Sequence, residues 1–185
     1  MPDKVLTETE DLMKKTLDAT RHELSKIRTG KASPALLDMV RVEYYGSQVP
    51  ITQVASVAAP EPRLLVVTPW DKAAVKPVAA AIRNAELGLN PQDDGAVIRV
   101  PVPQPNEERR RDLVKMVGRL VEEGRVRVRQ VRRDANERLK KMDKDGHVSE
   151  DDIKKLHDRI QKLTDDYVKH MDDLLARKQA EVMEV

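Results

Sequence analysis

The stretch 124-GRVRVRQVRRDAN-136 decides how the second half of the chain folds. Read locally, RVRVR alternates basic and apolar residues with a period of two, which is typical of a strand with one solvent-exposed face. Over a longer window the apolar positions follow a helical repeat, with Leu113, Val114, Val117, Val121, Val128, Val131, Ala135, Leu139 and Met142 as its members. The longer period predicts one helix of about 36 residues, roughly 54 Å long.

The ends of this helix also have recognisable signals. Asn106 is a suitable N-cap residue, and Glu107 and Glu108 are favourable in a first helical turn. Gly146 is expected to end the helix. Gly118 and Gly124 count against the prediction, because each glycine inside a helix costs about 1 kcal/mol relative to alanine.

Two further helices are predicted, one on either side in the sequence. Between Asp3 and Arg28, a helical stripe is formed by Val5, Leu12, Leu17, Leu24 and Ile27, with Met13 and Thr16 in between. After the 146–149 turn, Ser149 and Asp152 have the spacing of a capping box. The helix that follows has a heptad-like stripe of Ile153, Leu156, Ile160, Leu163, Tyr167, Met171, Leu174 and Val182. Three long amphipathic helices predict a three-helix bundle.

A segment of different composition separates the first helix from the second. Ten of the eleven prolines lie between Gly30 and Pro105. Within this segment we expect a β-hairpin (40–45 and 49–57), a buried strand (64–68), a helix starting at Pro77 and running to about residue 86, a loop (87–95) and a last strand (96–103). The predicted fold class is therefore α+β: a bundle domain of residues 1–29 and 106–185, interrupted by a small β/α/β domain of residues 30–105.

Composition excludes several classes of protein. The 185 residues include no cysteine, so disulfides and thiolate metal sites are excluded. The N-terminal MPDKVLTETEDLM lacks the apolar segment of a secretory signal, and no run is long enough for a membrane span. We therefore expect a cytoplasmic protein without membrane contact. Aromatic residues make up 2% of the chain, too few for base-stacking platforms.

The small net charge of +2 hides an uneven distribution. Residues 107–142 carry thirteen basic and seven acidic residues, whereas residues 143–185 carry eight basic and twelve acidic ones. On a helical wheel, one arc of the second helix, termed here the basic face, contains Arg111, Lys115, Arg125, Arg129, Arg132, Arg133 and Lys140, with Glu122 as its one acidic member.

Two interpretations of the basic face remain open. It is either a solvated surface paired with the acidic third helix, or a surface that binds phosphates. Arginine favours the second, because its planar guanidinium forms bidentate contacts with phosphate. Arg125, Arg129, Arg132 and Arg133 are the candidate RNA-binding residues on this face.

Motifs for catalysis or cofactor binding are missing from the sequence. No pair among His22, His147, His157 and His170 has metal-ligand spacing, and no nucleotide-binding or nucleophile motif occurs. Asp143, Asp145 and Gly146 resemble part of a calcium loop, but Lys141 stands at the first ligand position. We expect a protein that is not an enzyme and that needs neither a cofactor nor a metal.

Five motifs resemble the bacterial ribosome recycling factor family along the whole chain: KIRTGKASPALLD (26–38), VEYYG (42–46), IRNAELGLNP (82–91), IRVPVPQPNEERRRDL (98–113) and VRQVRRDAN (128–136). The resemblance implies a three-helix bundle and an inserted domain set at an angle in an L. It implies a monomeric translation factor that binds the large ribosomal subunit through ribosomal RNA. With elongation factor G and GTP, such a factor splits the post-termination ribosome into subunits and releases mRNA for recycling.

The resemblance also assigns roles to individual residues. Arg132 matches the principal RNA-contacting arginine of the family, Arg129 a supporting one, and Arg110 a third. The interdomain hinge corresponds to Thr29, Gly30 and Lys31 in the first crossing between domains and to Gln104, Pro105 and Asn106 in the second.

Two alternatives belong to other classes of protein. A structural protein whose helices pair with partner helices would explain the heptads, but not the arginines or the insertion; oligomeric state distinguishes it from the translation factor. An enzyme has no group of residues to support it, and activity screening, including GTPase activity, would test it.

Overall fold

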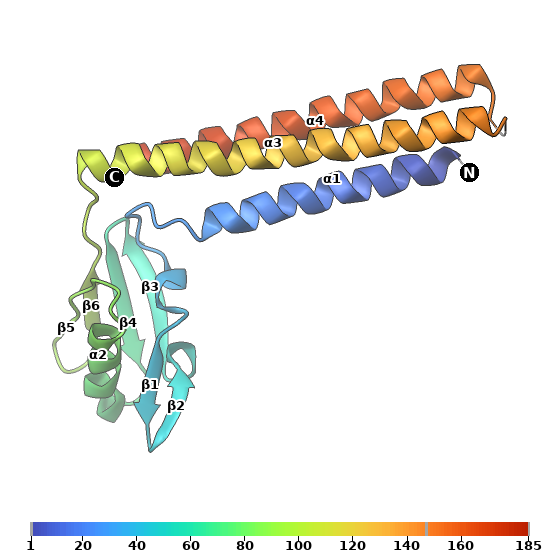
Figure 1. Ribbon diagram of the computed structural model, residues 1–185. Helices are drawn as coiled ribbons and strands as arrows, with labels where there is room; N and C mark the ends of the chain where they lie inside the picture. The colour runs from blue at the N-terminus through green and yellow to red at the C-terminus, as the bar shows by residue number, and fades with distance from the viewer. Residues whose placement is uncertain (1, 147, 185) are drawn as a thin grey trace. The chain divides into compact units, whose positions relative to one another are not determined.

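The computed structural model describes residues 2–146 and 148–184, which form two compact units. The helical unit contains residues 2–28 and 109–184, and the inserted unit contains residues 29–108. The α+β fold class is confirmed, because long helices occupy the first unit and a small mixed structure occupies the second (Figure 1).

Three long helices lie side by side in the helical unit (Figure 1). They are α1 (Pro2–Ser25), α3 (Glu107–Lys144) and α4 (Glu150–Met183). Helix α3 runs antiparallel to both others (Figure 1). The contacts Arg138–Glu8 and Gly124–Thr20 show this for α1, and Arg125–Asp172 and Arg132–Gln161 show it for α4. The RVRVR stretch lies inside α3, so the helical prediction is confirmed and the local alternation does not produce a strand.

The apolar core of the helical unit follows the predicted stripes on α3 and α4. On α1 the prediction is wrong at one position: Leu12 is 49% exposed, whereas its neighbour Met13 is fully buried. The buried side of α1 includes two threonines, Thr9 and Thr20, which a search for apolar residues does not find. Their hydroxyls donate to carbonyl oxygens one turn earlier, at 2.6 and 3.0 Å, so burial leaves neither unsatisfied.

The presence of glycine at position 124 has a structural reason that the sequence did not reveal. Gly124 is buried in α3, and a Cβ atom there would lie 2.7 Å from Thr20 Oγ1 and 3.0 Å from both Sδ and Cε of Met171. Helices α1 and α4 thus come so close to α3 that there is no room for a side chain. At Gly118 a Cβ would meet nothing within 4 Å among the described residues.

The connection between α3 and α4 is a short turn. Gly146 has a left-handed backbone with φ of 67°. Ser149 is the N-cap of α4: its Oγ accepts from the Asp152 amide at 3.2 Å and donates to Asp152 Oδ2 at 2.8 Å. The predicted cap is confirmed. His147, which follows Gly146, lies outside the described residues.

The inserted unit contains two antiparallel sheets. Strands β1 (Arg41–Tyr44) and β2 (Ser47–Pro50) form a hairpin. The larger sheet has the order β3-β4-β6-β5, with β3 (Ala55–Glu61), β4 (Leu64–Pro69), β5 (Gln92–Asp93) and β6 (Ile98–Pro101). Helix α2 (Val75–Asn84) buries Val75, Val78, Ala79 and Ile82 in the core of this unit. Short 3-10 turns cover Pro34–Leu37, Ile51–Gln53 and Lys72–Ala74.

Three local predictions in this unit need correction. The predicted strand 49–57 is two strands, because β2 ends at Pro50 and a 3-10 turn buries Ile51 before β3 begins and pairs with β4. The predicted loop 87–95 includes the short strand β5, which pairs with β6. Helix α2 begins at Val75, two residues before Pro77, and ends at Asn84.

Within the described residues, no helix is both long and apolar enough to cross a membrane.

Candidate RNA-binding surface

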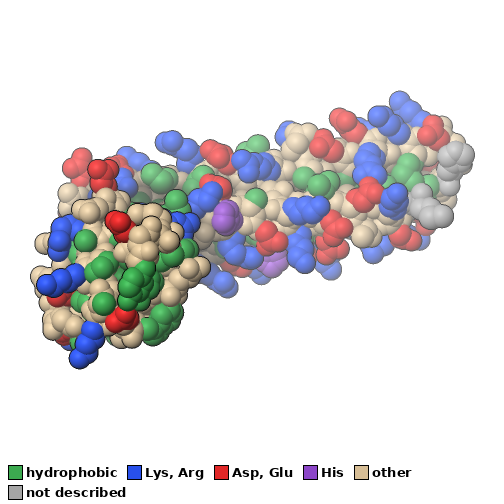
Figure 2. Space-filling view, turned by 90° about the horizontal axis from the view of Figure 1, so that it is seen from below, with side chains coloured by type: hydrophobic (Ala, Val, Ile, Leu, Met, Phe, Trp, Pro, Cys, Tyr) green, Lys and Arg blue, Asp and Glu red, His purple; other side chains and the backbone are tan. Residues whose placement is uncertain are grey.

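The surface of the helical unit carries charges of both signs. On the face shown in Figure 2, Lys and Arg side chains alternate with Asp and Glu side chains along the helices. The availability of a given arginine for an external phosphate therefore depends on its immediate partners. The arginines predicted on α3 differ sharply in this respect.

Arg125 is held by carboxylates on two sides. Its Nε donates to Asp172 Oδ1 of α4 at 2.9 Å, its Nη2 also contacts Asp172 Oδ1, and its Nη1 donates to Glu122 Oε2 at 3.0 Å. Only 17% of the side chain is exposed. Burial acts to lower the pKa of Arg125, but the hydrogen bonds to these carboxylates outweigh it and the pKa is raised above its ordinary value.

The pairing of Arg125 has a consequence for the basic face. The wheel placed Glu122 as the one acid on this arc, yet α4 adds Asp172 to it. Pairing with the acidic helix, which was the alternative interpretation, therefore occurs at Arg125. The register between the two helices creates this contact, and a single-helix wheel contains no such information.

Arg129 and Arg133 are more open. Arg129 Nη1 lies 3.6 Å from Glu122 Oε1, beyond hydrogen-bonding distance, and 46% of its side chain is exposed. Arg133 is exposed and makes no hydrogen bond or ion pair with any described residue. Both guanidinium groups are accessible from solvent.

Arg132 is held differently from Arg125, by a neutral group. Its Nη1 donates to Gln161 Oε1 of α4 at 3.1 Å. The same amide donates through Nε2 to Asp165 Oδ1 at 2.9 Å. Within the described residues, Arg132 forms no ion pair, and neither its Nε nor its Nη2 forms a hydrogen bond. The guanidinium is fixed in place while its charge and one bidentate edge remain available.

A second polar contact joins α3 and α4 one turn further along. Asn136 Oδ1 lies 2.9 Å from His157 Nδ1, and both side chains are partly buried. Neither residue was predicted as part of the site. The antiparallel register of α3 and α4 is the signal that could identify them, because the Asn136–His157 pair lies next to the Arg132–Gln161 pair across the same interface.

Arg110 lies in the first turn of α3, away from the four arginines just described. Its side chain is partly buried, and its Nε is buried without a hydrogen-bond partner among the described residues. The structure therefore does not bring Arg110 together with Arg129 and Arg132, which lie five to six turns further along α3.

The predicted hinge residues lie just outside two backbone anchors of the inserted unit. The Ala32 amide donates to the carbonyl of Pro62 at 2.7 Å, and the Val102 amide donates to the carbonyl of Arg63 at 2.8 Å. Both crossing segments are thus fixed by the same β3–β4 turn. Thr29 is buried, whereas Lys31, Gln104 and Asn106 are exposed and Pro105 is partly buried. Gly30 has φ of 86°, a conformation that favours glycine.

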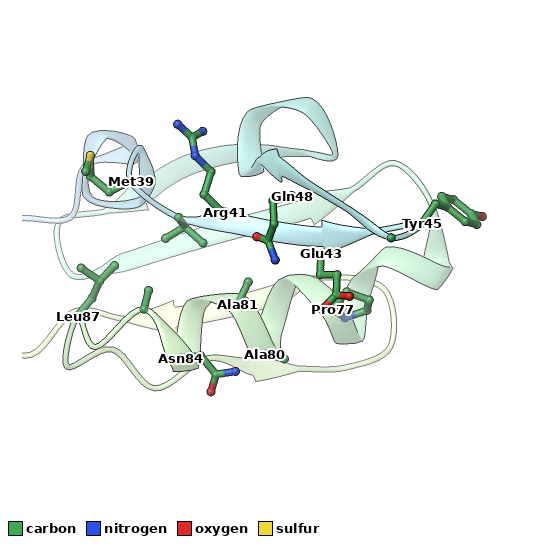
Figure 3. Close-up of a pocket in the computed structure, with 13 residues that line it drawn as sticks. Met39, Arg41, Glu43, Tyr45, Gln48, Pro77, Ala80, Ala81, Asn84 and Leu87 are labelled. Atoms are coloured by element: carbon green, nitrogen blue, oxygen red, sulfur yellow. The ribbon is translucent and has the colours of Figure 1, made fainter.

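A groove in the inserted unit was not predicted. It has a volume of about 750 Å³ and lies between the β1–β2 hairpin and α2 (Figure 3). Arg41, Glu43, Gln48 and Asn84 line it together with the exposed Met39. Among the described residues, no three His, Asp or Glu side chains gather as metal ligands there or elsewhere.

Two exposed aromatic residues of the inserted unit, one in the β1–β2 turn and one directly after β4, were also not singled out. Tyr45 is 82% exposed and Trp70 is 68% exposed. Tyr44, partly buried beside Tyr45, donates from its hydroxyl to Asp71 Oδ2 at 3.1 Å. Burial and this hydrogen bond raise the pKa of Tyr44 to about 12. Tyr45 follows β1 in the hairpin turn, where its backbone is left-handed with φ of 49°, so the turn signal YYG predicts its exposure.

Comparisons with known proteins agree over the whole chain. The family model described as ribosome recycling factor matches residues 20–183. The chain is 50% identical over 185 residues to the ribosome-recycling factor of Symbiobacterium thermophilum, with 100% of each chain covered. It is 51% identical over 180 residues to the ribosome-recycling factor of Rubrobacter xylanophilus, with 97% of each chain covered.

Solved structures give the same result. A solution structure of a ribosome recycling factor has a TM-score of 0.75 at 42% identity, covering 100% of this chain and 98% of the other. The T. thermophilus ribosome recycling factor, in a structure with E. coli elongation factor G on the E. coli post-termination complex, has a TM-score of 0.65 at 44% identity, with 98% of each chain covered. Together with the bundle, the insertion and the arginines of α3, these matches show that the chain belongs to the ribosome recycling factor family.

Proposed function

We propose that this protein binds the post-termination ribosome and, with elongation factor G and GTP, promotes its dissociation into subunits and the release of mRNA. Full-length identity of about half to ribosome-recycling factors supports this function. A similar protein is found with elongation factor G on a post-termination complex, which supports these two partners. The cytoplasm, where ribosomes end translation, is the proposed location.

The observation that carries the proposal is the state of Arg132. It is fixed by a neutral amide, it forms no ion pair among the described residues, and its Nε–Nη2 edge is available. That edge has the geometry for bidentate contact with an RNA phosphate. Arg129 and Arg133 are proposed to add phosphate contacts beside it, and Arg110 to contribute further positive potential to the same RNA. Arg125, also predicted as an RNA-binding residue, is proposed to contribute little, because Asp172 and Glu122 compensate its charge.

We also propose that the two units are joined by a hinge. Thr29, Gly30 and Lys31, with Gln104, Pro105 and Asn106, form a two-segment hinge. The anchors at Pro62 and Arg63 fix where both segments enter the inserted unit, so bending is confined to the residues outside them. Elongation factor G, which hydrolyses GTP, supplies the energy. This protein is not an enzyme, acts as a monomer and needs no cofactor.

Subunit splitting, followed by light scattering, tests the proposal. Post-termination ribosomes are mixed with elongation factor G, GTP and the protein. Wild type is expected to split them, and Arg132→Ala is expected to fail while its circular dichroism spectrum is unchanged. In binding to large ribosomal subunits, Arg132→Ala lowers the slope of log K against log salt by about one unit.

A matched control is Arg21→Ala, which removes the same charge from an exposed residue of α1. It should bind and split as wild type does. Wild-type protein that neither binds large subunits nor splits ribosomes would refute the function. Self-association into long oligomers would instead favour the helix-pairing protein.

A further inference from the structure

The partners that α4 gives to the arginines of α3 differ in one chemical respect. Arg125 meets a carboxylate, Asp172, whereas Arg132 meets an amide, Gln161. Both contacts restrain a guanidinium at the α3–α4 interface. Only the carboxylate neutralises the charge, so the two arginines present very different potentials to an approaching phosphate.

The two partners also occupy different edges of the guanidinium. Asp172 takes Nε and Nη2 of Arg125, which is the edge that forms bidentate contacts, and Glu122 takes Nη1. Gln161 takes only Nη1 of Arg132. Arg125 is therefore saturated within the protein, whereas Arg132 retains the Nε–Nη2 edge for an external ligand.

Asp165 fixes which end of the Gln161 amide faces Arg132. A guanidinium only donates hydrogen bonds and an ionised carboxylate only accepts them. Because Gln161 Nε2 donates to Asp165 Oδ1, the amide oxygen must point toward Arg132. The contact from Asp165 spans one turn of α4, so helix geometry sets it independently of any ligand.

We infer that Gln161, oriented by Asp165, is the positioning residue that presents Arg132 to RNA. Because Gln161 is an amide and not a carboxylate, the charge and the Nε–Nη2 edge of Arg132 stay available to a phosphate, unlike those of Arg125. The inference rests on the proposed function. It predicts that the identity of the α4 partner, more than the position of an arginine on α3, decides which arginine contributes to RNA affinity.

The decisive variant is Gln161→Glu, which supplies Arg132 with the kind of partner that Arg125 has. Binding to purified large ribosomal subunits should weaken about tenfold, and the salt slope should fall by about one unit, as for loss of one phosphate contact. The Tm should change by less than about 3 °C, because two exposed hydrogen bonds, to Arg132 and Asp165, are replaced by an exposed ion pair with Arg132 and an exposed like-charge contact with Asp165.

Gln161→Met removes both hydrogen bonds of the amide, to Arg132 and to Asp165, without adding charge. It should weaken binding only about threefold and leave the salt slope unchanged, because Arg132 keeps its charge and loses only its restraint. Gln53→Glu is the matched control: it makes the same change of charge at an exposed residue of the inserted unit and should bind like wild type.

A double-mutant cycle separates a local effect from a general one. If Gln161 acts through Arg132, Gln161→Glu should have no further effect in the Arg132→Ala background. Equal weakening in both backgrounds would overturn the inference, as would wild-type affinity for Gln161→Glu or a loss of affinity matched by a fall in Tm. If Arg132→Ala itself binds like wild type, Arg132 makes no RNA contact and the inference falls with it. Wild-type protein that fails to bind large subunits would refute the proposed function itself.

Discussion

Gly124 lies on the buried side of α3, where a methyl group would collide with side chains of both neighbouring helices. In Gly124→Ala the new Cβ would be 2.7 Å from Thr20 Oγ1 and 3.0 Å from Sδ and Cε of Met171. The Thr20 side chain resists displacement, because it is β-branched and its hydroxyl donates to the Thr16 carbonyl. Met171 is flexible but fully buried, so it can move only by disturbing other core residues.

Two opposing effects set the magnitude. Alanine gains about 1 kcal/mol over glycine inside a helix. Overpacking a well-filled core costs about 1–3 kcal/mol. The free energy of unfolding should therefore fall by about 0–2 kcal/mol in Gly124→Ala. Gly118→Ala is on the same helix, and outside its own helical turn the new Cβ would meet no atom of the described residues within 4 Å. This variant should gain up to about 1 kcal/mol.

The quantity to measure is the difference between these two variants, in urea, by circular dichroism at a helical wavelength. Gly118→Ala should be more stable than Gly124→Ala by about 1–3 kcal/mol. Thr20→Ala removes the closest contact, so Gly124→Ala should cost less in that background. Equal stabilisation by both alanines would refute the close approach of α1 and α4 to α3 at Gly124.

Three further predictions concern a cap, a titrating group and the proposed hinge. Ser149→Ala removes the N-cap of α4 and the contact to Asp152, and should lower the free energy of unfolding by about 1 kcal/mol in urea. Tyr44 should titrate near pH 12 in ultraviolet absorbance, and Asp71→Asn should lower its pKa. Because the folded-state pKa of Tyr44 is raised above the usual 10, the contribution of protonated Tyr44 to the free energy of unfolding is complete below pH 10 and is lost as pH rises toward 12. Gly30→Ala places a side chain on a backbone with φ of 86° and should lower the free energy of unfolding in urea by about 1–2 kcal/mol. An unchanged free energy of unfolding would mean that the segment has another conformation in solution.

Helical periodicity predicted most of the helical unit because its signal is long. The apolar positions of α3, from Leu113 to Met142, repeat over about eight turns, so two glycines and the local RVRVR alternation did not change the result. In α1 the same method placed Leu12 on the apolar stripe, although Leu12 is exposed and Met13 beside it is the buried residue. The true buried side includes Thr9 and Thr20, whose hydroxyls bond within the helix, and hydrophobicity alone does not identify such residues.

The candidate site was predictable as a set of arginines but not as a set of contacts. A wheel places Arg125 and Arg132 on one arc, and they look equivalent there. The difference between them comes from Asp172 and Gln161, which lie 47 and 29 residues further along the chain. Only the register of two packed helices brings these partners together. Strand boundaries near Pro50 failed for a related reason, since tertiary pairing of β3 with β4 ends the first hairpin.

The insertion of one unit between α1 and α3 dictates an order of events during synthesis. Helix α1 is complete at Ser25, but α4, which packs beside it, ends at Met183. At a synthesis rate of roughly 5–20 residues per second, α1 waits about 8–30 s for its last partner, while the contiguous inserted unit can fold first. During that interval the side of α1 destined for the core faces water. The threonines at positions 9 and 20 make that side less apolar than leucine would, which lowers the risk of aggregation of the nascent chain.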